Sequence, residues 1–190
     1  MSTAPPYTMK LTLDVLDHLG LNLYSNIPAV LAEAVANCWD ADASRVEVSL
    51  DVDNGEIVIS DDGCGMTRAE TNDRYLKVGY RRRSSQPTRT PRFNRHVMGR
   101  KGIGKLSLFS ISNDIEVQSA KKVNDSVERS AFRMRTSAIR DQMAGGGGEY
   151  HPDPITPDLD LSIGTRITLR QLTKKITAGT AAALRRRLAR

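Results

Sequence analysis

Residues 25–66, SNIPAVLAEAVANCWDADASRVEVSLDVDNGEIVISDDGCGM, decide the fold of this chain. The stretch opens with Ser25 or Asn26 as a helix N-cap and has Pro28 in the first turn. Apolar residues then recur at three- and four-residue spacing, which predicts a helix with one buried face. The residues of this face are Val30, Leu31, Ala34, Val35 and Cys38.

Two short alternating runs follow the predicted helix. Residues 45–51 read RVEVSLD and residues 56–60 read EIVIS, and the turn-forming residues 53–55 stand between them. This pattern predicts an antiparallel hairpin. The sequence DDGCGM, residues 61–66, comes directly after the second strand and forms a glycine-containing turn.

Further helices and strands are predicted on both sides of an arginine-rich segment. Residues 79–101 hold two prolines and no sustained period, so they are expected to form a long lid. The other predicted elements are a short helix at 13–18, a capped helix at 67–77, a helix at 102–112, strands at 114–120, 127–139 and 164–172, and a helix from 178. This order predicts a two-layer α/β (α+β) sandwich, with helices on one face of a mixed, mostly antiparallel sheet.

Composition narrows the class of protein. The chain has 190 residues and a formal charge of +6, and residues 74–105 contain 11 Lys and Arg with no Asp or Glu. It has no apolar run of the roughly 18–20 residues that span a membrane and no secretory signal, so a cytoplasmic protein without membrane contact is expected. Two cysteines and three histidines make a disulfide framework or a zinc site improbable.

Polar side chains on the first predicted helix are the first candidate site. Glu33, Asn37 and Asp40 stand four and three residues apart, so they project along one stripe beside the apolar face. Such a stripe can line a cavity. The same spacing is also typical of a solvated amphipathic helix.

The turn at residues 61–66 is the second candidate. Two glycines allow the backbone to approach a flat ligand closely, and the Asp61 carboxylate can accept a hydrogen bond from an amine such as that of adenine. A plain turn of Asp and Gly remains the alternative. A calcium loop is excluded, because no glutamate follows at the required spacing.

The sequence GRKGIGKLS, residues 99–107, is the third candidate. It contains GxxxxGK, but Leu106 occupies the position where a P-loop needs Ser or Thr, and residues 92–98 make a poor preceding strand. A P-loop NTPase is therefore disfavoured. A glycine-rich turn that opens a helix still suits an anionic phosphate.

Taken in order, these motifs resemble the GHKL ATPase superfamily, which includes DNA gyrase, the ninety-kilodalton heat-shock chaperones, histidine kinases, MutL-type repair proteins and MORC proteins. The resemblance runs from about Tyr24 to Leu172 and is nearest to Hsp90-like and MORC-like bacterial modules. It implies the Bergerat ATP-binding fold with ATP and Mg²⁺ as cofactors. By this resemblance Glu33 is the general base, Asn37 binds magnesium and Asp61 receives the adenine amino group. The remaining implied nucleotide contacts are Asp40, Ala41, Gly63, Gly65, Met66, Gly99, Gly102, Ile103, Gly104, Lys105, Leu106 and Thr165.

The resemblance also implies a function and a domain plan. Residues 25–175 would form the ATP-binding domain, residues 1–24 a dimerisation strap, and residues 176–190 a helix that leads into a further domain. The expected function is Mg-dependent ATP hydrolysis that drives homodimerisation as a clamp. Hydrolysis is expected to be slow, because hydrolysing relatives take a lysine that contacts the γ-phosphate from the following domain. A non-hydrolysing ATP sensor or a DNA-contacting module is the alternative.

The arginine-rich segment has two interpretations besides a solvated loop. Its cations can neutralise the triphosphate or contact DNA. The aromatic residues near it in sequence are Tyr75, Tyr80 and Phe93. They do not form an evident stacking platform, so recognition of a single strand is not favoured.

Overall fold

The computed structural model describes residues 6–10, 26–77, 88–98, 104–144 and 149–189. Its elements, in chain order, are β1 (Met9–Lys10), α2 (Ile27–Asp40), β2 (Val46–Asp51), β3 (Glu56–Asp61), α3 (Arg68–Glu70), the π-helical η1 (Thr71–Tyr75), the 3-10 helix η3 (Gly104–Ser110), β4 (Ser112–Val123), β5 (Ser126–Arg135), α4 (Thr136–Ala144), β6 (Glu149–Tyr150), β7 (Asp153–Pro154), β8 (Gly164–Leu172) and α5 (Ala178–Leu188).

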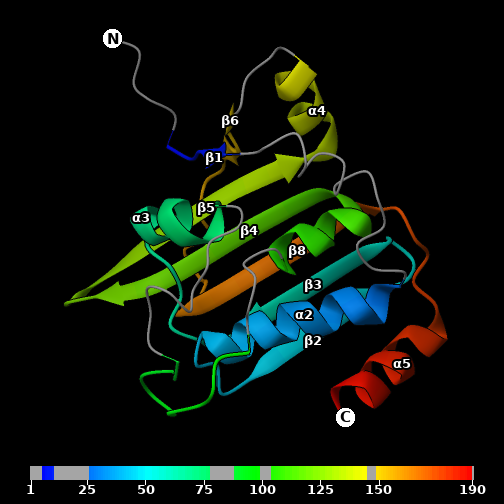
Figure 1. Cartoon of the computed structure of the whole chain (residues 1–190), viewed down its shortest axis with the longest axis horizontal. Helices are drawn as coiled ribbons and strands as arrows, with labels where there is room; N and C mark the ends of the chain where they lie inside the picture. Colours follow the sequence, from blue (N-terminus) through cyan, green and yellow to red (C-terminus); the bar gives the residue numbers. More distant parts are fainter. Residues whose placement is uncertain (1–5, 11–25, 78–87, 99–103, 145–148, 190) are drawn as a thin grey trace.

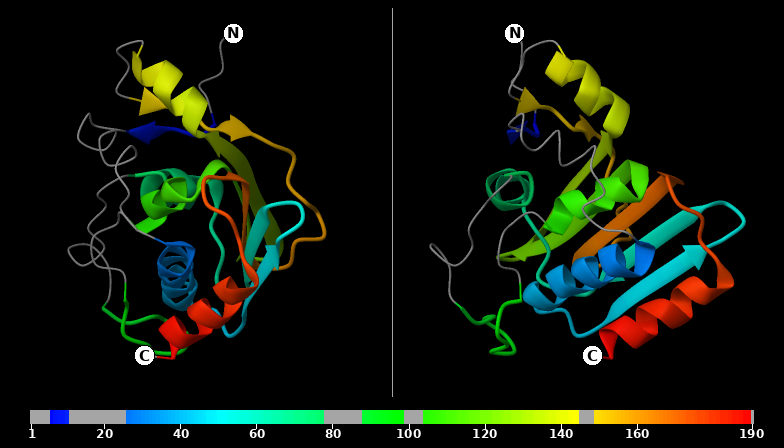
Figure 2. Two further views of the ribbon diagram at one scale, coloured as in Figure 1. Left: turned by 90° about the vertical axis from the view of Figure 1, so that its right-hand side faces the viewer. Right: turned by 45° about the vertical axis from the view of Figure 1, so that its right-hand side comes forward.

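The main sheet has six strands in the order β2-β3-β8-β4-β5-β7, and β1 pairs separately with β6. Every strand pair within the described ranges is antiparallel. Figure 1 shows α2, η3 and α5 lying on one face of this sheet, and the left view of Figure 2 shows the two layers edge-on. The predicted two-layer sandwich is therefore confirmed.

The core lies between α2 and the sheet. Asn26 is the N-cap of α2, and its side-chain Oδ1 accepts a hydrogen bond from the Ala29 amide at 3.0 Å. Val30 and Leu31 on α2 are fully buried, as are Ile57 and Ile59 on β3. Because these residues lie on the apolar faces expected from the sequence, packing holds α2 across the strands that carry the site.

Several predicted boundaries differ from the structure, and in two places the type of element also differs. The strand predicted over 127–139 ends at Arg135, and α4 begins at Thr136. Ser137 and Ala138 have low β propensity, and the helical turn buries Ile139. In its described part, the helix predicted over 102–112 is the 3-10 helix η3, Gly104–Ser110, and Ser112 already begins β4.

The capping box at residue 67 is confirmed, although the helix that follows is irregular. The Glu70 amide donates to the Thr67 hydroxyl at 3.1 Å, and the Thr67 amide donates to the Glu70 carboxylate at 3.0 Å. From Thr71 the helix widens, because the Leu76 amide bonds to the Thr71 carbonyl at 2.8 Å. The Thr71 hydroxyl also bonds to Ser130 at 3.2 Å, which ties this turn to β5.

The first described residues lie along β5. The Tyr7 side chain is buried, and its hydroxyl accepts the Ala131 amide of β5 at 3.0 Å. Asn72 holds the same segment from η1, with hydrogen bonds to the Pro6 carbonyl and the Thr8 amide. The predicted helix at 13–18 and most of the strap predicted for residues 1–24 fall outside the described ranges. Within those ranges, no helix has both the length and the apolar character needed to cross a bilayer.

Candidate functional site

Three parts of the fold meet where the inner strands β3 and β8 end and begin: the end of α2, the turn after β3 and the start of β8. The Cys64 amide of the turn donates to the Ala41 carbonyl at 2.8 Å. A Cβ atom on Gly63 would lie 2.6 Å from the same carbonyl. The turn can therefore approach the helix this closely only with glycine at position 63.

Asp61 is the carboxylate that faces into this meeting point. It is the last residue of β3, is partly buried, and accepts the Gly63 amide at 2.8 Å. Burial raises the pKa of Asp61, although hydrogen bonds from Gly63, the Cys38 thiol and the Thr165 amide act in the opposite direction. Burial and the neighbouring Asp61 charge raise the pKa of the Cys38 thiol, so it stays protonated, and its Sγ donates to the Ala34 carbonyl at 3.2 Å.

Asp62 has a different role from Asp61. Its carboxylate is exposed and accepts the amides of Ser44 at 2.7 Å and Arg45 at 2.8 Å. A further hydrogen bond from the Ser44 hydroxyl lowers the pKa of Asp62. The Asp62 carboxylate therefore fixes the loop after α2, whereas the adjacent Asp61 carboxylate faces the site.

A row of polar side chains continues from Asp61 across the sheet. Asp61 pairs with Thr165 on β8, Thr165 pairs with Ser119 on β4, and Ser119 pairs with Ser130 on β5. The Ser119 hydroxyl lies 3.0 Å from the Thr165 hydroxyl, donates to the Gly164 carbonyl and accepts the Met66 amide at 2.8 Å. Ser119 thus ties the turn after β3 to the start of β8.

Sequence reasoning missed Ser119. A serine within an alternating strand carries no local signal of this role, since only strand register brings it beside Thr165. The partners Met66 and Thr165 were both predicted as site residues, and the structure brings both to Ser119.

We expect Ser119→Ala to lower the free energy of unfolding by about 1–2 kcal/mol, because the partly buried Met66 amide loses its acceptor. Thermal or urea unfolding measures this change. Ser49→Ala is the matched control, because Ser49 is exposed on β2, and its stability should change by less than about 0.5 kcal/mol. Equal stability of Ser119→Ala and the parent chain would contradict this role for the hydroxyl.

Two further positions in this region, 65 and 164, accept only glycine, because another part of the backbone lies against them. Gly65 has φ +62, and a Cβ atom there would lie 2.0 Å from the Ala120 carbonyl oxygen. Gly164 has φ +137, and its Cβ atom would lie 1.9 Å from the Asp61 carbonyl oxygen. Both positions combine a backbone conformation that favours glycine with no room for a side chain.

Glu33 and Asn37 lie on one stripe of α2, as their spacing predicts. Glu33 is partly buried and Asn37 is exposed. Neither side chain has a hydrogen bond or ion pair within the described parts of the chain, so both remain available to a ligand.

Asp40, the third member of the predicted stripe, contacts the chain itself. It is 6% exposed, and its Oδ1 accepts the Met98 amide at 2.8 Å. The carboxylate therefore holds the segment at residues 88–98 against α2. A contact between Asp40 and a nucleotide stays a prediction.

The neighbouring Asp42 holds the same segment and was not predicted. Asp42 has φ 59, and its carboxylate accepts the Arg92 amide at 2.7 Å and the Phe93 amide at 3.3 Å. Burial alone would raise the pKa of Asp42, but hydrogen bonds from Thr90 and these amides lower it overall. The described part of the predicted lid is thus fixed to the end of α2 and the turn after it by the carboxylates of Asp40 and Asp42.

The predicted glycine-rich cradle is only partly within the described residues. Gly99, Gly102 and Ile103 fall outside them, Gly104 begins η3, and the Leu106 side chain is buried. Residues 92–98, which would precede a P-loop, are mostly exposed and contain an isolated bridge at His96 in place of a buried strand. This arrangement does not fit a P-loop.

Comparison with known proteins agrees with this geometry. Residues 24–144 match the family described as histidine kinase-, DNA gyrase B- and HSP90-like ATPase. The chain is 37% identical over 171 residues to a protein named "Putative type II restriction enzyme HgiDII" from Herpetosiphon aurantiacus, covering 90% of this chain and 27% of that protein. It is 31% identical over 169 residues to the chaperone protein HtpG of Acinetobacter baylyi, covering 78% of this chain and 24% of the chaperone.

The chain spans about a quarter of the length of these relatives. The matched region contains α2, the β2–β3 hairpin and the turn after β3, while β8, which also contributes to the site, lies outside the matched residues. Similarity to HtpG agrees with the Hsp90-like part of the resemblance. The chain therefore belongs to the family of histidine kinase-, DNA gyrase B- and HSP90-like ATPases, whose membership supports ATP binding.

Proposed function

We propose that this domain binds Mg-ATP between α2, the turn after β3 and the start of β8, and hydrolyses it slowly as part of a larger protein. The observation that carries this proposal is the Asp61 carboxylate, partly buried beside Gly63 at the end of β3. A partly buried carboxylate contributes little to packing, and it is well suited to accept a hydrogen bond from an amino group.

The adenine end of the proposed site is formed by the turn and β8. Asp61 accepts a hydrogen bond from the adenine amino group, and the backbone of Gly63 and Gly65 is proposed to contact the flat base. Thr165 adjoins Asp61 in the sheet, with its hydroxyl on the Ser119 side. Ala41 and Met66 complete the proposed contacts with the base.

The phosphate end of the proposed site lies nearer the N-terminus of α2. Cys38 contacts Asp61, and Glu33 is five residues earlier, so the two ends are separated by about 7.5 Å along the helix axis. Glu33 acts as the general base for the attacking water, and Asn37 binds Mg²⁺ through its side-chain oxygen. One protein oxygen suits magnesium, which keeps several waters and shares phosphate oxygens with the nucleotide.

The loop that leads into η3 completes this end of the site. Gly99, Gly102, Ile103, Gly104, Lys105 and Leu106 are proposed to cradle the phosphates, as the family resemblance implies. Their charge stabilisation alone gives slow turnover, since phosphoryl transfer depends on positioned cations. ATP-driven homodimerisation as a clamp is the proposed use of this cycle.

A second candidate concerns the whole protein. The relative named as a type II restriction enzyme is matched over more of this chain, and at higher identity, than the HtpG chaperones. This observation favours a protein in which the ATP-binding module serves a reaction on DNA over one that serves as a chaperone.

We expect the chain to bind ATP with Mg²⁺, to turn over far more slowly than the roughly 10 per second of a median enzyme, and to double its mass with a non-hydrolysable ATP analogue. Calorimetry measures the binding, phosphate release the turnover, and analytical ultracentrifugation the mass. An unchanged mass with bound analogue would contradict the clamp. The absence of binding heat and of a thermal shift would contradict the nucleotide site itself.

A further inference from the structure

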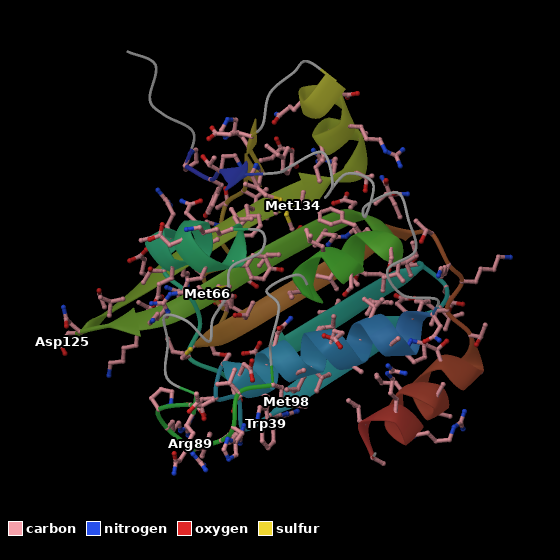
Figure 3. The ribbon with its side chains drawn as sticks, in the orientation of Figure 1. Trp39, Met66, Arg89, Met98, Asp125 and Met134 are labelled. Carbon is pink, nitrogen blue, oxygen red and sulfur yellow. The ribbon has the colours of Figure 1, made fainter. Side chains whose placement is uncertain are left out.

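An exposed arginine–aromatic surface is formed where residues 88–98 meet the end of α2. We define it by Trp39, Arg89, Arg92, Phe93 and Arg95. The Arg95 guanidinium lies 4.3 Å from the ring centroid of Trp39 and 4.3 Å from that of Phe93, and the Arg92 guanidinium lies 4.5 Å from the Phe93 centroid. Figure 3 labels Trp39 and Arg89 in the same lower part of the view, and the hydrogen bond from Trp39 to the His96 carbonyl links the two segments.

This surface is held in place by hydrogen bonds to its own elements. The Trp39 indole nitrogen donates to the His96 carbonyl at 3.1 Å, and the Arg95 guanidinium donates to the Ala43 carbonyl at 2.6 Å. The Asp42 carboxylate accepts backbone amides from the same segment. The rings and the Arg95 guanidinium are therefore pre-organised, unlike arginines on a solvated loop.

The arginine–aromatic surface is also open and positively charged. Trp39 is 41% exposed and Phe93 is 39% exposed. In the part of the chain that the structure describes, neither Arg89 nor Arg92 forms an ion pair with a carboxylate, and Arg89 instead bonds to the Asn94 carbonyl and the His96 ring. Two large rings that stay partly exposed, next to arginines that have no carboxylate partner among the described residues, point to a ligand.

We propose that the arginine–aromatic surface binds single-stranded nucleic acid. Unpaired bases stack on the rings of Trp39 and Phe93 and on guanidinium planes, while Arg89 and Arg92 attract the phosphates. A duplex fits less well, because its bases are already stacked on one another and their faces are not available to the rings. An acidic peptide would use the cations and leave both rings without a role.

Trp39 was not among the aromatic residues that the sequence places near this segment. Phe93 alone is no platform, but the fold places Trp39 of α2 next to it through Arg95. The surface uses none of the residues proposed to contact ATP, so it goes beyond the proposed nucleotide site and can be tested without ATP.

Trp39 provides a direct probe, because it is the one tryptophan of the chain. We expect an oligothymidylate of about 16 nucleotides to quench its fluorescence when added to the nucleotide-free 190-residue chain. Binding should weaken with salt, with a slope of about −0.7 in log K against log salt for each phosphate contacted. A duplex of the same length and polyglutamate are expected to bind more weakly and without quenching.

Three variants identify the parts of the surface. Phe93→Ala, which keeps the backbone bonds to Asp42, should weaken oligothymidylate binding by about 5-fold or more. Arg92→Ala should reduce the magnitude of the salt slope by about 0.7. Arg186→Ala removes an equal charge from the exposed face of α5 and should leave quenching and affinity nearly unchanged.

Each result has a defined meaning. Far-UV circular dichroism checks that the variants fold, and Phe93→Leu replaces Phe93→Ala if the smaller side chain prevents folding. Quenching that is lost or weakened in Phe93 variants but kept in Arg186→Ala supports the proposal. No binding, binding without quenching, equal or tighter binding of duplex or polyglutamate, or equal affinity of the Phe93 variants would overturn it.

Discussion

Replacing Asp61 with asparagine is expected to weaken ATP binding by about 100-fold or more while the chain stays folded. The adenine amino group would lose a charged acceptor worth about 1.5–3 kcal/mol, and the introduced amide can turn a donor toward another donor. Together these effects reach about 2.8 kcal/mol, which corresponds to 100-fold in affinity.

Calorimetric titration with Mg-ATP measures the effect of Asp61→Asn. Asp62→Asn is the matched control, since it changes the adjacent carboxylate, which bonds to Ser44 and Arg45 and faces away from the proposed site. The control should keep most of its ATP affinity. Similar losses in both variants, or no loss in Asp61→Asn, would contradict the proposed role of Asp61.

The pH dependence of binding provides a second readout of the same variant. Burial raises the pKa of Asp61 above its ordinary value of about 3.9. ATP needs the ionised carboxylate as acceptor, so affinity should fall as the pH is lowered through that raised pKa. Without ligand the sign is opposite: the native state binds more protons than the unfolded chain in this window, so the contribution of Asp61 to stability falls as pH rises. Asp61→Asn removes both dependences.

Replacing Glu33 with alanine is expected to lower the rate of ATP hydrolysis by about 10²- to 10⁴-fold, the range of a general base. ATP affinity should change little, because Glu33 acts on the attacking water. Steady-state phosphate release measures the rate, and calorimetry measures the affinity.

Glu47→Ala is the control for Glu33→Ala. Glu47 is exposed on β2 and forms a surface ion pair with Arg45, so its loss should leave both rate and affinity unchanged. If Glu33→Ala hydrolyses ATP at the parent rate, Glu33 is not the general base, and if the parent chain binds ATP without hydrolysing it, the domain is better described as an ATP sensor. If Glu33→Ala fails to bind ATP, Glu33 contributes to binding.

Much of the fold follows from short-range pattern. The apolar spacing and the Asn26 cap predict α2, and the turn between the two alternating runs predicts the β2–β3 hairpin. The strand predicted at 164–172 coincides with β8. These features succeed because propensity, capping and turn chemistry act within a few residues. The prediction for the end of β5 was wrong for the opposite reason. An alternating pattern does not show that the chain turns into a helix at Thr136, where the helix buries Ile139.

The sequence by itself determined which residues can take part in chemistry: the Glu33–Asn37 stripe and the Asp61 turn with its glycines. Only the tertiary structure decided which of them meet and what else joins them. Strand register places Ser119 beside Thr165, helix packing places the Cys38 thiol on Asp61, and docking of residues 88–98 places Arg95 on Trp39. These contacts join residues up to 56 positions apart, and they depend on register and packing, which no local pattern encodes.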